Sequence, residues 1–154
     1  MNHDHLFAFE DDFVTSLRCI PMAVRLKLDR CGLKLSLRQW TGLTTHDRQA
    51  LLTRPCEATN RSKDTYREWL EFLVHERTGD RVSPLPDPVL PVWESVDGPP
   101  WPVRDFATRT GLRPPDPDEW RGLSELQRFA LVKLSRDNHD NVNFAPALRE
   151  FGIG

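Results

Sequence analysis

A chain of 154 residues, 38% of them hydrophobic, is long enough to bury a core and suits one domain. Its net charge of −2 excludes a strong whole-molecule attraction to nucleic acid or to an anionic membrane. No apolar run approaches the roughly 20 residues that a membrane-spanning helix needs. The first residues lack a cationic leader followed by an apolar core, so we expect no signal peptide and a cytoplasmic protein.

An apolar stripe at helical spacing opens the chain. It recurs at steps of three or four residues and consists of Phe9, Phe13, Leu17, Ile20, Val24 and Leu28. Pro21 interrupts the stripe without changing its phase. This pattern predicts two helical segments, with Pro21 near the start of the second and Gly32 at its end.

Three further helices are predicted before residue 80. They are a short helical piece around Trp40, a helix from Thr44 or Thr45 to about Thr53, and the amphipathic helix 62–78, which Gly79 ends. Residues 80–102 then hold seven of the 13 prolines, so we expect neither a helix nor a central strand there. Their apolar side chains favour an extended strap packed on the domain, and a proline-rich recognition segment is the alternative.

The second half of the chain repeats the first. Residues 21–51 align with 100–131 at twelve identical positions, where residue usage predicts roughly two by chance. The identities include Pro21/Pro100, Gly32/Gly111, Trp40/Trp120 and Leu51/Leu131. We therefore predict an all-α fold: repeat one at about 21–79, a Pro-rich strap at about 80–99 and repeat two at about 100–152. The two repeats would pack as a pseudo-symmetric bundle over one core, and a linear helical repeat is the alternative.

The three cysteines have no counterparts in the second repeat. Cys19, Cys31 and Cys56 are an odd number without CxxC spacing, which argues against a disulfide framework and for a reducing compartment. They are interpreted first as small buried side chains, and otherwise as reactive thiols or as metal ligands with His3 or His5. Cys19 is the best candidate for reactivity, because it precedes a predicted helix start beside Arg18.

Positive charge is concentrated early in the chain, where residues 18–54 hold eight basic and two acidic residues. Arginines that recur in both repeats, such as Arg48 and Arg128, are assigned structural roles. The candidates for binding an acidic partner or an anionic cofactor are Arg18, Lys27, Arg30, Lys34 and Arg38, unless they form only a solvated face.

No catalytic motif accompanies these residues. The five histidines are scattered, the glycines stand singly at helix stops, and no nucleotide fingerprint is present. The polar run 137–141 lacks the glycine and the terminal glutamate of a calcium loop and predicts a turn. We therefore predict no catalytic residue, no metal and no cofactor.

The motif LRCIPM at 17–22, with Lys27-Leu28-Asp29, Cys31-Gly32, Trp40 and Pro55-Cys56, resembles the nitrate reductase-associated protein family. The resemblance implies a partner in nitrate reductase or a molybdenum-cofactor protein. The leading hypothesis is a non-enzymatic accessory protein that binds that partner through its basic surface. A sulfur or redox carrier using Cys19, Cys31 or Cys56 is the alternative, and the missing motifs disfavour an enzyme of cofactor metabolism.

Overall fold

The computed structural model describes residues 7–10, 20–57, 59–85, 97–136 and 141–153. These residues confirm the predicted all-α class: they form eight α-helices and a single two-stranded sheet. The chain divides into two compact units, Met1–Val89 and Leu90–Gly154. A single domain over 1–154 therefore stays a prediction. Among the described helices, none combines the length and the apolar character needed to cross a membrane.

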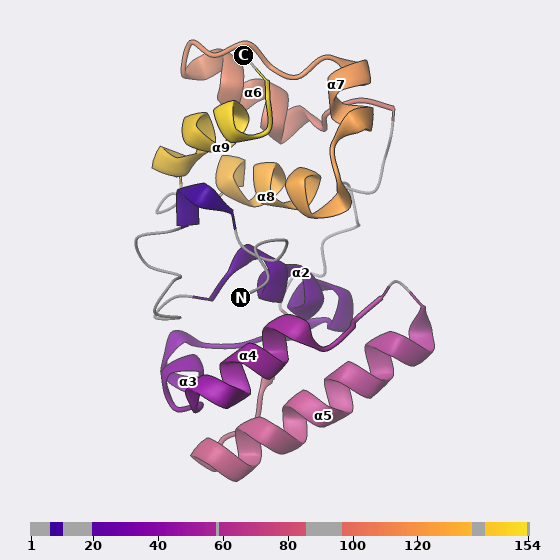
Figure 1. The fold of residues 1–154 in the computed structure, drawn as a ribbon, viewed down its shortest axis with the longest axis vertical. Helices are drawn as coiled ribbons and strands as arrows, with labels where there is room; N and C mark the ends of the chain where they lie inside the picture. The colour runs from indigo at the N-terminus through magenta and orange to yellow at the C-terminus, as the bar shows by residue number, and fades with distance from the viewer. Residues whose placement is uncertain (1–6, 11–19, 58, 86–96, 137–140, 154) are drawn as a thin grey trace. The chain divides into compact units, whose positions relative to one another are not determined.

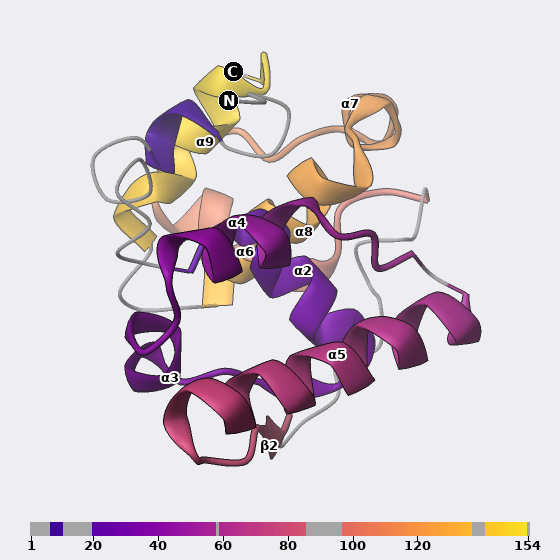
Figure 2. The same ribbon diagram turned by 60° about the horizontal axis from the view of Figure 1, so that its bottom comes forward.

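The first unit is built around α2. Its elements are η2 (Ala8–Glu10), α2 (Met22–Cys31), β1 (Leu33–Lys34), α3 (Leu37–Thr41), α4 (Thr45–Thr53), α5 (Asn60–Thr78) and β2 (Ser83–Pro84). Helix α2 packs against both α4 and α5 (Figures 1 and 2). Strand β1 pairs antiparallel with β2, which places Leu33 opposite Pro84.

The ends of α2 follow the sequence prediction. Pro21 is the N-cap residue, with a φ of −65° that already suits a helix start, and Gly32 ends the helix in the left-handed region at φ 70°. Val24 and Leu28 of the predicted stripe are buried in α2. The upstream segment of the stripe, 11–19, lies outside the described residues.

The end of α4 depends on side chains from two other helices. Because Pro55 has no N–H, the Leu51 carbonyl lacks its usual helical partner, and the Tyr66 hydroxyl of α5 donates to it at 2.8 Å. Lys27 of α2 donates to the next carbonyl, that of Leu52, at 2.6 Å. Three helices are therefore joined where α4 stops.

The proline-rich segment departs from its prediction at one end. Helix α6 begins at Trp101, inside the 80–102 stretch in which no helix was expected. Pro102 lies in the first turn of α6, where a missing N–H costs nothing. Pro84 lies in a two-residue edge strand, which a proline also tolerates. The strap prediction falls mainly on 86–96, outside the described residues.

The second unit is built around α8. Its elements are α6 (Trp101–Arg109), α7 (Pro117–Gly122), α8 (Glu125–Arg136), η4 (Asn141–Asn143) and α9 (Phe144–Glu150). Helix α8 packs against α6 and α9 (Figure 1). Phe129 of α8 is completely buried, and the rings of Phe106 and Phe144 meet edge to face at 4.9 Å. The turn predicted at 137–141 falls largely outside the described residues.

Candidate functional site

Two of the three cysteines meet inside the first unit. Cys31 is the last residue of α2, and Cys56 lies in the loop between α4 and α5. Their sulfur atoms are 3.4 Å apart, although 25 positions separate the residues in sequence. Both residues are buried, with exposed fractions of 6% and 2%. The interpretation of both as buried side chains is therefore right about burial, but it did not foresee that they form a pair.

Local structure explains why the sulfurs converge. Gly32 ends α2 directly after Cys31, and Pro55 turns the chain after α4 so that Cys56 returns to α2. The Cys56 thiol lies 3.7 Å from the Lys27 carbonyl of α2. The Cys31 thiol lies 3.5 Å from the Lys63 carbonyl of α5. Each thiol therefore contacts the backbone of one helix as well as its partner sulfur.

Cationic side chains fix the backbone around the pair. Arg30 donates from Nη1 to the Cys56 carbonyl at 2.7 Å, and Arg67 of α5 donates to the Cys31 carbonyl at 3.3 Å. Lys27 donates to the Arg54 carbonyl at 2.5 Å as well as to Leu52. Charge-assisted bonds of this kind are about twice as strong as neutral ones. The loop that carries Cys56 is thus held by α2, and the end of α2 is held by α5.

These contacts change the interpretation of two predicted partner-binding residues. Lys27 and Arg30 are only partly exposed and have internal hydrogen-bond partners, so they are not available as a free basic surface. The sequence prediction missed this because the carbonyls that accept these bonds lie 25–27 positions further along the chain. Arg48, by contrast, confirms its predicted structural role by donating to the Trp40 carbonyl at 3.1 Å.

The pair is electrostatically asymmetric. The hydrogen bond with the Cys31 thiol lowers the pKa of Cys56, and the charges of Arg30, Lys27 and Lys63 lower it further, while burial acts in the opposite direction. The same hydrogen bond raises the pKa of Cys31, and burial adds to that increase. Cys56 is therefore the thiol that carries negative charge when the pair loses one proton.

Lys27 and Tyr66 complete the surroundings of the pair. Burial lowers the pKa of Lys27 to about 8, to which the charge of Arg30 also contributes. Burial raises the pKa of Tyr66 well above its usual value, and the nearby cysteines act in the same direction. The Lys27 ammonium lies 6.0 Å from the centre of the Tyr66 ring. The phenol stays neutral and serves as a hydrogen-bond donor.

The remaining predicted site residues lie elsewhere. Lys34 on β1 and Arg38 on α3 are exposed, while Arg18 and Cys19 lie outside the described residues. Within the described parts of the chain, no three His, Cys, Asp or Glu side chains come together as a metal site would need. The alternative of a metal site with His3 or His5 also falls outside them.

A comparison with protein families places these features in context. A model described as the conserved nitrate reductase-associated protein family matches residues 6–151. The chain belongs to this family. The match spans all three cysteines and both compact units. No curated protein and no solved structure matches the chain.

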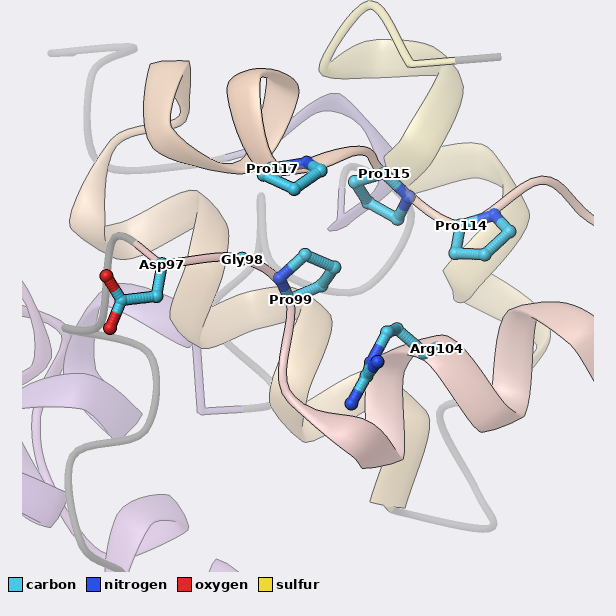
Figure 3. A pocket seen from close by; sticks show the side chains of 7 residues that line it. All are labelled: Asp97, Gly98, Pro99, Arg104, Pro114, Pro115 and Pro117. Carbon is cyan, nitrogen blue, oxygen red and sulfur yellow. The ribbon is translucent and has the colours of Figure 1, made fainter.

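The second unit of this nitrate reductase-associated family member has a surface pocket of about 380 Å³. The rings of Pro99, Pro114, Pro115 and Pro117 line it together with Asp97, Gly98 and Arg104 (Figure 3). The Asp97 and Arg104 side chains are exposed, so neither provides a buried, oriented polar group. The pocket therefore offers the apolar surface of proline rings, without a buried polar side chain among its lining residues.

Sequence reasoning missed the contribution of α5 to the cysteine site. Lys63, Tyr66 and Arg67 follow the spacing i, i+3 and i+4, which places them on neighbouring parts of one helix face. That spacing is a signal for a basic flank on the amphipathic helix, which the sequence prediction did not use. It did not indicate that this flank faces Cys31 and Cys56, because that depends on how α5 packs against α2.

Proposed function

We propose that this chain is a non-enzymatic accessory protein that binds nitrate reductase, or a protein that handles its molybdenum cofactor. The description of the family supports an association with nitrate reductase. The observation that carries the proposal is a corner of exposed cations in the first unit, formed by Lys34, Arg38 and Arg81. This corner replaces the larger basic surface predicted from the sequence, because Lys27 and Arg30 have internal partners.

Three backbone segments bring these cations to one part of the unit. Lys34 lies on β1 opposite Ser83, two residues after Arg81. Arg38 precedes Gln39 on α3, and the Gln39 side chain donates to the Arg81 carbonyl at 3.2 Å. The exposed acidic residue next to Arg81 in sequence is Asp80, so positive charge predominates in the corner formed by the three cations. Such a corner would orient an acidic partner and raise its association rate.

The test is capture of nitrate reductase by the tagged full chain from nitrate-grown cells. We expect the triple variant Lys34→Glu, Arg38→Glu and Arg81→Glu to lose most of the capture, and added salt to weaken binding of the unmodified chain. The matched control reverses three other exposed arginines, Arg61, Arg136 and Arg149, with the same change in charge. Full capture by the folded first variant at low salt would reject the corner.

We also propose that the two units are degenerate repeats of one helical design. Pro21 and Pro100 are both N-cap residues with nearly the same φ, −65° and −67°. Trp40 and Trp120, which align in sequence, are both 0% exposed. An experimental structure in which 21–54 superposes on 100–134 would support the proposal, and divergent helix paths would reject it.

A second candidate function, a thiol-based carrier, is favoured by the 3.4 Å approach of Cys31 and Cys56. Between the two carrier chemistries, the pair suits redox exchange better than sulfur storage. A persulfide on Cys56 would lie within reach of the Cys31 thiol. Attack by Cys31 on the inner sulfur would release hydrosulfide and leave a disulfide, so the stored sulfur would be lost.

A further inference from the structure

We infer that Cys31 and Cys56 form a reversible two-electron redox couple, in which Cys56 reacts with a hydroperoxide and Cys31 then closes a disulfide. This inference deepens the second candidate function, on which it rests, and does not depend on the docking role. It rests on three observations: the short distance between the sulfurs, their burial, and the cations around them.

The two sulfur atoms need to move only a short distance to form a disulfide bond. The sulfurs are 3.4 Å apart, and a disulfide bond measures about 2.05 Å, so they must approach by roughly 1.4 Å. Cys56 lies in a loop rather than in a helix, so a small shift of its side chain towards Cys31 does not disturb a helix. The reduced pair is therefore close to the arrangement that oxidation requires.

The cations favour a thiolate at Cys56. Arg30 and Lys27 carry positive charge from α2, and Lys63 carries it from α5. The Cys31 sulfur lies 3.4 Å from the Cys56 sulfur, so the resolving thiol is already next to the atom that is oxidised first. Thiolates rather than thiols attack peroxides, which assigns the first step to Cys56.

The chemistry balances in two steps. The Cys56 thiolate attacks one oxygen of hydrogen peroxide, the O–O bond breaks, and Cys56 sulfenic acid and hydroxide form. The Cys31 sulfur then attacks the Cys56 sulfur, an S–S bond forms, the S–O bond breaks, and water leaves with the Cys31 proton. The two cysteines together lose two electrons. A small dithiol such as dithiothreitol reverses the change by thiol–disulfide exchange and is itself oxidised to a cyclic disulfide.

Burial restricts the oxidant to a small molecule. With exposed fractions of 6% and 2%, the pair is shielded from bulky disulfides in the folded protein, whereas hydrogen peroxide is close to water in size. A second oxidant molecule would have to enter the same buried site, whereas the Cys31 sulfur is already 3.4 Å from the Cys56 sulfur. Cys31 therefore captures the intermediate before further oxidation, which is what protects a reversible thiol site.

The first experiment uses the full, unmodified chain. The reduced protein is treated with hydrogen peroxide, its remaining thiols are alkylated under denaturing conditions, and its peptides are analysed by mass spectrometry. We expect the protein to lose the mass of two hydrogens, to yield a peptide pair linked through Cys31 and Cys56, and to recover both thiols with dithiothreitol. The control Cys19→Ser should behave identically. A folded chain whose Cys31 and Cys56 stay reduced, or a disulfide that uses Cys19, would overturn the inference.

A second experiment tests the order of the steps. In Cys31→Ala the sulfenic acid at Cys56 has no resolving partner, so dimedone should trap it. In Cys56→Ala the sulfenic acid at Cys31 should form, and be trapped by dimedone, more slowly, on the order of tenfold. Burial raises the pKa of Cys31, and only Arg67 and Lys63 oppose it, whereas Arg30, Lys27 and Lys63 lower the pKa of Cys56. Equal or faster trapping at Cys31 would overturn the assigned order. Circular dichroism identifies a variant that fails to fold, and the Cys→Ser form then replaces it.

Discussion

Oxidation of the Cys31–Cys56 pair should stabilise the protein measurably. The disulfide would close a loop between residues 25 positions apart, which removes conformational entropy from the unfolded chain. The loop-entropy relation gives about 3.5 kcal/mol at 25 °C for a loop of this length. Domains of this size have unfolding free energies of about 5–15 kcal/mol, so the gain is a substantial share of the total.

Urea denaturation of the oxidised and the reduced chain measures this gain. With a slope of about 2 kcal/mol per molar urea, the midpoint should rise by roughly 1.5–2 M on oxidation. Dithiothreitol should remove the increase, and Cys19→Ser should retain it. If the oxidised chain unfolds at the same or a lower urea concentration, the native structure does not accommodate the disulfide. The geometric reasoning for the redox couple would then be refuted.

Three further predictions concern contacts inside the units. The Arg77 guanidinium lies 2.7 Å from the Asp47 carboxylate and holds the pKa of Asp47 at about 2, below its ordinary 3.8. Asp47 therefore contributes stability that is present above about pH 5 and is lost as the pH falls towards 2. Because Arg77 is partly exposed, we expect Asp47→Asn to cost about 1–2 kcal/mol at pH 7 and to flatten that pH dependence in urea titrations. Tyr66→Phe leaves the Leu51 carbonyl without its donor and should cost about 1–3 kcal/mol; no change in the urea midpoint would show that water replaces the phenol. Phe129→Ala should cost about 3–5 kcal/mol by calorimetry, and a loss below 1 kcal/mol would mean that the second unit collapses around the vacancy.

Several features of the fold follow from short-range sequence patterns. Pro21 and Gly32 bound α2 as predicted, because each favours its backbone conformation regardless of distant contacts. The Thr44 cap of α4 likewise needs only a side chain and the backbone three residues ahead. The start of α6 was misjudged because a high proline content was interpreted as excluding a helix. A proline in the first turn is compatible with one.

The cysteine site could not be predicted in the same way. Cys31 and Cys56 were correctly expected to be buried, since a free thiol packs as a small apolar group. No local pattern pairs Cys31 with Cys56, because their approach depends on how the α4–α5 loop meets the end of α2. The same packing directs Lys27 and Arg30 to backbone carbonyls, although as sequence they resemble the exposed Lys34 and Arg38. The sequence thus determined where α2 and α4 begin and end. Only the tertiary structure decided which thiols and charges meet, because those contacts join residues that no helical or turn periodicity relates.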